Sequence, residues 1–288
     1  MPYLYLVLSV FMSASSSVFG KIFNQENETK KDSSSFYNVL LMISVFLGWG
    51  ILYATDFSFH ISVLLYSILF AVCYGACNLG IINALNHGPT MLTSLFLGLS
   101  LLLTTVWGFI FWDTQLTVLV AVGLILVICA ITLCLYSKEK DKKTISLKWI
   151  FYIVLACLGN AGCSIVQRTQ QVQYDGMYGN MLMFFATGLS MLAYLYVYLR
   201  SDKSDSKALF KTSWWLPVSA GVCNVVLNLF VMLMAVTDLS PSLIYPVIGV
   251  GSLAVVTIFS LFIFKEKMRW WQWVGVAVGA IAVVLLSI

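Results

Sequence analysis

One apolar stretch of the chain, residues 147–174, carries polar side chains at helical spacing. At i, i+4, i+7 and i+11 the sequence places Asn160, Ser164, Gln167 and Gln171, with Arg168 beside them. Amide and hydroxyl groups both donate and accept hydrogen bonds, which suits a neutral or zwitterionic polar solute. On a helix these residues share one face, and in a bilayer that face must turn toward protein or a water-filled cavity.

Other apolar stretches carry polar pairs of the same kind. They are Tyr74 and Asn78, Asn224 and Asn228, and Ser13 and Ser17, each pair at i, i+4. Tyr245 precedes Pro246, which frees a carbonyl within an apolar run and predicts a kink that can border a cavity. We expect the asparagine pairs and the Asn160–Gln167 face to line a cavity. The serines are also candidates for the cavity, but for them bonding to a neighbouring helix, at about 0.6 kcal/mol on average, is the favoured interpretation.

Arg168 admits two interpretations. If it lies in the cavity, its planar guanidinium can hold a carboxylate or a phosphate group through two parallel hydrogen bonds. Its position near the end of an apolar stretch also allows it to snorkel to the lipid head groups.

The twelve acidic residues all fall in or beside the polar connections, and none lies in the middle of an apolar run. A carrier that exchanges protons for cationic drugs needs a buried carboxylate. The sequence therefore argues against that class and favours a facilitator or exchanger for a polar metabolite, neutral or anionic.

The elements that position these residues are membrane spans. Of the 288 residues, 60% are hydrophobic and 10% are charged, whereas a soluble domain carries about 25% charged residues. Runs of about 20 apolar residues predict ten spans, near 2–22, 36–54, 59–83, 89–112, 116–136, 148–171, 177–199, 213–236, 240–264 and 270–287. The net charge of +4 does not indicate nucleic-acid binding, because the basic residues occupy short connections between these spans.

The seven cysteines lie inside apolar runs, without the spacing of a metal site or a disulfide framework. We interpret them as buried small apolar residues and expect no metal and no cofactor. No nucleophile–base pair is within reach along a predicted helix, so an enzyme is not expected.

The two halves of the chain resemble each other. An offset of 147 places Ser13 on Asn160, Ser17 on Ser164, and Lys21 on Arg168. We therefore predict a single transmembrane domain over 1–288, with one repeat at 1–137, a basic linker at 138–147 and a second repeat at 148–288. Five spans per repeat make the second half enter the membrane from the opposite side. This predicts an all-α inverted repeat around a central cavity near the midplane.

Charge predicts the orientation. The first, fifth, seventh and ninth connections contain or border 15 of the 16 basic residues, and Arg168 is the remaining one. Because positive loops stay in the cytoplasm, these odd-numbered connections are expected inside the cell and both termini outside.

The closing segment, Ala235 to Leu286, resembles the EamA-type repeat of the drug/metabolite transporter superfamily. The similarity lies in the order of its landmarks: Ala235, Ser242, Pro246, Glu266, Gln272, Gly275 and Gly279. The first half holds a weaker copy from Ala84 to Leu133, in which Asp113 takes the place of the turn acid and Val127 replaces the second glycine.

The resemblance implies ten helices around a cavity that opens alternately to the two sides of the membrane, and a small metabolite as substrate. Relatives often place both termini in the cytoplasm, with basic residues after the second span. The connection at 55–59 has no basic residue, so the outward termini are kept as the expectation here.

The expected function is secondary transport of a small polar metabolite, either amino acid-like or an anionic or phosphorylated compound, across the cell membrane. Two alternatives are translocation of a lipid-linked head group and a non-transporting membrane sensor or subunit. The expected partners are this solute and the bilayer, with no nucleic acid. A homodimer through Gly275 and Gly279 is possible, although close packing inside the monomer is the favoured role of this GxxxG pair.

Overall fold

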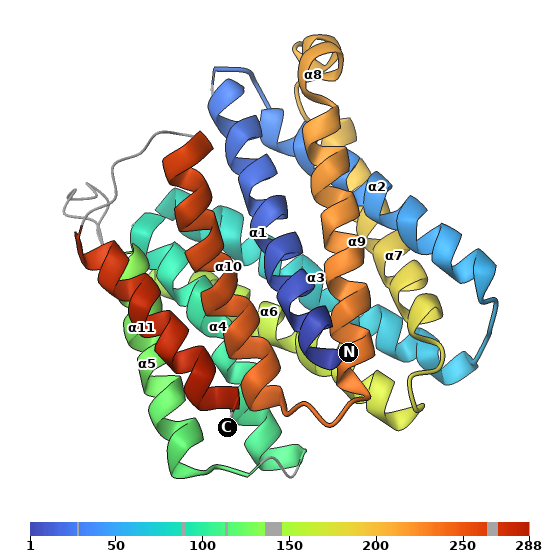
Figure 1. Ribbon diagram of the computed structural model, residues 1–288. Helices are drawn as coiled ribbons and strands as arrows, with labels where there is room; N and C mark the ends of the chain where they lie inside the picture. Colours follow the sequence, from blue (N-terminus) through green and yellow to red (C-terminus); the bar gives the residue numbers. More distant parts are fainter. Residues whose placement is uncertain (28, 88–89, 113–114, 136–145, 264–269, 288) are drawn as a thin grey trace.

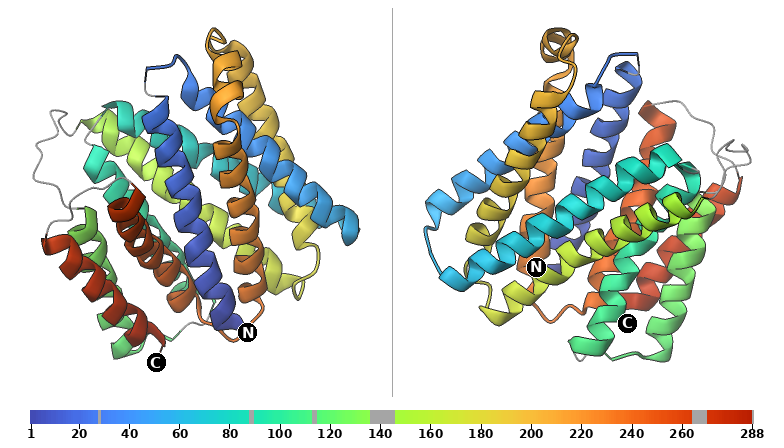
Figure 2. Two further views of the ribbon diagram at one scale, coloured as in Figure 1. Left: turned by 45° about the horizontal axis from the view of Figure 1, so that its top comes forward. Right: turned by 180° about the vertical axis from the view of Figure 1, so that it is seen from behind.

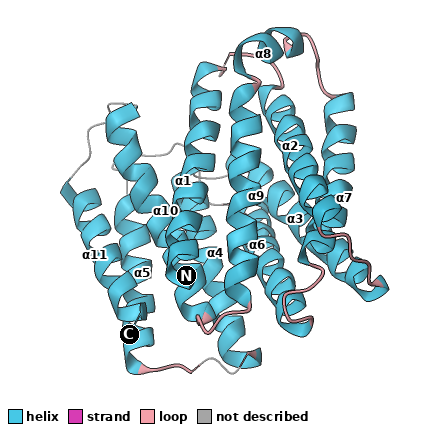
Figure 3. Cartoon of the chain, turned by 45° about the vertical axis from the view of Figure 1, so that its right-hand side comes forward, coloured by secondary structure: helices cyan, strands magenta, loops and turns pink. Residues whose placement is uncertain are grey.

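The computed structural model describes residues 1–27, 29–87, 90–112, 115–135, 146–263 and 270–287. Within these ranges every regular element is a helix (Figure 3). The helices are α1 (Pro2–Glu26), α2 (Ser33–Thr55), α3 (Ile61–His87), α4 (Thr90–Phe111), α5 (Val118–Leu135), α6 (Leu147–Gln173), α7 (Gly179–Arg200), α8 (Ser206–Ser213), α9 (Trp215–Ala235), α10 (Pro241–Ile263) and α11 (Trp270–Ser287). Most of the predicted basic linker, together with Asp113 and Glu266, lies outside the described residues.

The chain is an all-helical, multi-pass membrane protein. Seven of the described helices, α1, α2, α3, α6, α7, α9 and α10, contain a segment long and apolar enough to cross a bilayer. Three shorter apolar segments lie in α4, α5 and α11. The outer faces carry large apolar side chains, such as Ile51, Leu65 and Leu158, which expose 60–67% of their surface. Such faces suit contact with lipid chains.

Helix α8 was not predicted, because the sequence around it is polar and was interpreted as a linker. One side of this short helix is apolar. Leu209 is buried there in a cluster with Phe23, Phe36 and Leu216. The helix thus covers the ends of α1, α2 and α9, and burial of this one leucine accounts for its position.

The ends of the bundle are distinguishable. Both termini lie at one end, whereas the α1–α2 turn and α8 lie at the other (Figure 1). At that second end, Asp32 accepts a hydrogen bond from the backbone N–H of Asp202 (2.6 Å), and Lys31 forms an ion pair with the Asp202 carboxylate (3.5 Å). These contacts join the α1–α2 turn to the α7–α8 connection, so two of the basic connections share one end of the molecule.

The helices pack in a regular set of pairs. α1 packs on α9 and α10, and α6 packs on α3 and α4. α2 packs on α7 and α9, and α3 packs on α7 as well as on α6. α5 pairs with α11, and α4 with α10. From behind, α3 and α6 run side by side along most of their length (Figure 2).

Glycines allow the closest of these approaches. A Cβ atom on Gly159 of α6 would lie 2.5 Å from the backbone nitrogen of Cys77, and one on Gly80 of α3 would lie 2.5 Å from that of Ala156. The α3 and α6 backbones are therefore in direct contact at two levels, as in membrane helix pairs built on small residues. On α11, a Cβ atom on Gly275 would lie 2.8 Å from the sulfur of Cys134, so this glycine of the GxxxG pair faces α5 of the same chain.

We predict that Gly159→Ala destabilises the protein by about 1–3 kcal/mol, because its methyl group meets backbone atoms of α3 that cannot move aside alone. The measurement is the midpoint of thermal unfolding in detergent. Gly75→Ala is the matched control, since a Cβ atom at Gly75 of α3 has no neighbour within 4 Å. Equal midpoints for both variants would contradict the close α3–α6 contact.

Candidate functional site

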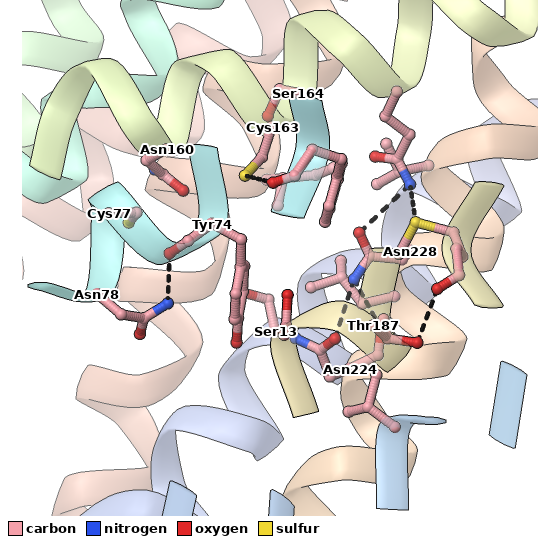
Figure 4. Close-up of a pocket in the computed structure, with 18 of the residues that line it drawn as sticks. Ser13, Tyr74, Cys77, Asn78, Asn160, Cys163, Ser164, Thr187, Asn224 and Asn228 are labelled. Carbon is pink, nitrogen blue, oxygen red and sulfur yellow. Dashed lines mark hydrogen bonds between the residues drawn. The ribbon is translucent and has the colours of Figure 1, made fainter. Parts of the chain in front are cut away.

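A cavity of about 330 Å³ lies between the helices, and we call it the central cavity. Its polar lining comes from α1, α3, α6, α7, α9 and α10, and its apolar lining includes residues of α2 and α4. The polar residues are Ser13, Tyr74, Cys77, Asn78, Asn160, Cys163, Ser164, Gln167, Thr187, Ser190, Asn224, Asn228 and Tyr245. Figure 4 shows their side chains approaching one another from different helices. The volume suits a small metabolite.

The structure brings together nine of the eleven residues that the sequence nominated for binding. These are Ser13, Tyr74, Asn78, Asn160, Ser164, Gln167, Asn224, Asn228 and Tyr245. Ser17 and Arg168 do not line the central cavity. Ser17 is exposed, and its hydroxyl donates to the Ser13 carbonyl one turn earlier (3.1 Å). That the nine residues bind a substrate stays a prediction.

Three amide side chains form a chain of hydrogen bonds along one wall. Gln167 of α6 is buried and donates to the Oδ1 of Asn228 (3.4 Å). Asn228 donates in turn to both the side-chain and the backbone oxygen of Asn224, at 3.1 and 2.9 Å. This chain fixes α6 against α9 and orients Asn224 at its end. Figure 4 shows these contacts as dashed lines.

Two further amides line the cavity from α3 and from an earlier turn of α6. Asn78 donates to the Tyr74 carbonyl one turn earlier on α3 (2.8 Å), and Asn160 donates to the Ser100 hydroxyl of α4 (2.6 Å). Within the described part of the chain, the side-chain oxygen of Asn160 and the side-chain nitrogen of Asn224 have no hydrogen-bond partner. The groups that the cavity offers to a polar solute thus include this acceptor on α6 and this donor on α9.

The lining is electrically neutral. No aspartate, glutamate, lysine, arginine or histidine is among the described residues that border the central cavity. A fully charged ion would lose its hydration here without a counter-charge, which is costly in a medium of low dielectric constant. The arrangement therefore suits a neutral or internally compensated solute, held by hydrogen bonds.

Of the polar cavity residues, sequence reasoning missed Cys77 of α3, Cys163 of α6 and two hydroxyl residues of α7, Thr187 and Ser190. Their hydroxyls donate to carbonyls of their own helix, at 2.7 Å to Met183 and 2.9 Å to Ala186. Their i, i+3 spacing resembles that of the nominated serines and is the signal that was available. Gln171, by contrast, belongs to the polar line but donates to neighbouring Gln170 (2.6 Å), near the α6–α7 turn and away from the cavity.

Arg168 lies in a second pocket at the end of the bundle where the termini lie. Its guanidinium stands over the ring of Trp112, 5.3 Å from the centroid. It also interacts with the hydroxyl of Tyr245, which donates to the Ser164 carbonyl (3.3 Å). Because Tyr245 lines the central cavity, this tyrosine stands between the two pockets.

We predict that Gln167 and Asn228 are energetically coupled. In a double-mutant cycle, Gln167→Ala and Asn228→Ala should be non-additive by about 0.6 kcal/mol and by no more than about 1.7 kcal/mol, the range for hydrogen bonds between membrane helices. The free energy of unfolding in detergent supplies the readout. Gln167→Ala with Asn83→Ala is the control cycle, since Asn83 donates to the Leu79 carbonyl of its own helix. Additivity in both cycles would refute the coupling.

Comparison with known proteins identifies a solved structure of similar fold. A structure solved by crystallography and described only as that of a protein aligns over 100% of this chain and 98% of its own, with a TM-score of 0.74 at 11% identity. At that identity the similarity concerns the fold alone. No curated protein matches the sequence significantly.

The decisive match is with the family model described as the EamA-like transporter family, which covers residues 147–288. This range runs from the first residue of α6 through α11 and includes the closing segment whose landmarks resembled that family. Residues 147–288 therefore form an EamA-like transporter domain, of the drug/metabolite transporter superfamily.

Proposed function

We propose that the protein is a secondary transporter that carries a small polar metabolite across the cell membrane by alternating access. The observation on which this rests is the central cavity, which is lined by neutral amide and hydroxyl groups from several helices. Because its lining is uncharged, an amino acid-like solute or another compensated molecule fits better than a phosphorylated dianion.

Alternating access requires two related states, and the helix packing supports an inverted repeat of ten spans. In such a repeat, each helix of the first half corresponds to one of the second: α1 to α6, α2 to α7, α3 to α9, α4 to α10 and α5 to α11. The α3–α6 pair then maps onto α9–α1, and α4–α6 onto α10–α1. The α2–α7, α4–α10 and α5–α11 pairs map onto themselves. This pattern supports two halves that exchange roles when the cavity opens to the other side.

The absence of charged residues from the described lining of the central cavity limits how transport could be coupled to proton movement. In the described residues of the cavity no carboxylate is present that could exchange a proton for the substrate. We therefore propose facilitated movement or exchange of solutes, in which transport is not driven by protonation of a buried acid.

A second candidate, translocation of a lipid-linked head group, is favoured by one observation. An apolar groove of about 620 Å³ lies between α4 and α6 and is lined by residues such as Phe96, Leu103 and Ile153. Ser100 lies in this groove and accepts the hydrogen bond from Asn160 of the central cavity. A lipid chain in the groove would place its head group near Asn160. A soluble substrate should stabilise the purified protein without lipid, whereas a lipid-linked one should not.

We predict that Asn160→Ala and Asn224→Ala abolish transport while the protein remains folded, because they remove an unpaired acceptor and an unpaired donor from the cavity lining. A thermal-shift screen of amino acids, nucleotides, sugar phosphates and organic acids would identify a substrate. Uptake of that compound into proteoliposomes would then be measured. Normal rates in both variants would refute the site.

Asn78→Ala and Asn83→Ala form a matched pair for the same assay. Each asparagine donates to the carbonyl four residues earlier on α3, at 2.8 Å in both cases. Only Asn78 lines the central cavity. We expect Asn78→Ala to slow uptake severalfold and Asn83→Ala to leave it unchanged. An equal loss in both variants would mean that the local helix bond is what matters.

The orientation predicted from charge, with both termini outside, can be tested by cysteine labelling of intact cells. A membrane-impermeant maleimide should modify Tyr3→Cys near the amino terminus. It should modify Ser204→Cys in the α7–α8 connection only after the cells are permeabilised. Both positions are exposed in the structure. The reverse pattern would place the termini in the cytoplasm, and the unmodified native protein gives the background from its seven cysteines.

A further inference from the structure

A second pocket of about 480 Å³, which we call the terminal pocket, opens at the end of the bundle where the termini lie. It is built from the ends of several helices and the turns between them. Its polar and charged residues are Tyr3, Trp112, Gln115, Thr117, Arg168, Thr237, Asp238, Ser240 and Ser242. None of these lines the central cavity.

The side chain of Arg168 is unsatisfied in this pocket. Only 8% of its surface is exposed, and its Nε and Nη1 atoms have no hydrogen-bond partner in the described part of the chain. Its contacts are the face of Trp112 and the Tyr245 hydroxyl. A buried guanidinium without a counter-charge is costly, and the cost falls when an anion pairs with it. The fork geometry suits a carboxylate or a phosphate group.

Two further features define the anion that the pocket would accept. The amino end of α10, at Pro241, forms part of the wall, and its partial positive charge adds to that of Arg168. Asp238 also lines the pocket, but no ion pair joins it to Arg168. A cation that has no ion-pair partner among the described residues and a carboxylate in the same pocket favour a ligand that carries one charge of each sign. They disfavour a phosphate dianion, which Asp238 would repel.

We propose that the terminal pocket is a second binding site, distinct from the central cavity, for a small carboxylate with a preference for zwitterions. The carboxylate pairs with Arg168 at the floor of the pocket, and an ammonium group on the same molecule lies toward Asp238 at its exposed rim. The site is defined by binding alone and does not depend on transport through the central cavity.

The test is thermal unfolding of the full-length protein in detergent at constant ionic strength. The probes are acetate, L-alanine and inorganic phosphate, with chloride as the reference anion. We expect L-alanine to stabilise the wild-type protein most, acetate less and phosphate least. Arg168→Gln should weaken the apparent affinity for acetate and L-alanine by about ten- to a hundredfold, the loss expected for a hydrogen-bonded charged pair.

Matched variants distinguish specific binding in the terminal pocket from nonspecific effects of charge on stability. Arg200→Gln removes another arginine that stands over an aromatic ring, 4.7 Å from the Tyr196 centroid and outside both pockets, and should leave binding unchanged. Asp238→Asn should abolish the advantage of L-alanine over acetate and raise the affinity for phosphate. If Arg168→Gln does not fold, Arg168→Lys keeps the charge without the fork, and it should bind acetate more weakly than the wild type.

Three results would overturn the proposal. The first is equal stabilisation of wild type and Arg168→Gln by acetate, or no stabilisation by any carboxylate. The second is an equal loss in Arg200→Gln, which would indicate a nonspecific ionic effect. The third is loss of carboxylate binding in Asn160→Ala and Asn224→Ala but not in Arg168→Gln, which would place the ligand in the central cavity. That last result would leave the proposed transport function standing.

Discussion

The close contact between the backbones of α3 and α6 is the constraint on which the rest of the structure depends. At Gly80 and Gly159 no room exists for a Cβ atom, so the two helices cross at a fixed distance. This contact sets the positions of Tyr74 and Asn78 on one helix and of Asn160 and Ser164 on the other. In hydrocarbon no water can satisfy a misplaced amide. The polar face of each helix is therefore turned inward, and the central cavity forms where those faces meet.

Much of this could be predicted from the sequence, because two rules are nearly independent of context. Helix periodicity places Asn160, Ser164 and Gln167 on one face, and the structure has them on one cavity. Apolar run length locates spans, and the described helices begin and end close to the predicted ranges. Membership of the EamA family, inferred from landmarks in the last fifth of the chain, is confirmed over residues 147–288.

What sequence reasoning missed depends on where side chains meet rather than on what they are. Arg168 follows Gln167 directly, and one helical step of about 100° turns it away from the central cavity toward the terminal pocket. That pocket is assembled from the ends of helices that are distant in sequence, so no local sequence pattern predicts it. Helix α8 was missed because one buried side chain, Leu209, holds an otherwise polar segment. For Thr187, the hydroxyl bond to its own helix gives no sign that the residue borders a cavity.

The neutral lining of the central cavity determines how membrane voltage acts on the carrier. Moving one elementary charge through a potential of 100 mV is worth about 2.3 kcal/mol. In the proposed alternating-access cycle, a cavity bordered by amides and hydroxyls would contribute no net charge to this work while it is empty. Any electrical current would therefore arise from the charge of the solute itself. A compensated solute would cross without current, and the direction of its flux would follow its concentration gradient.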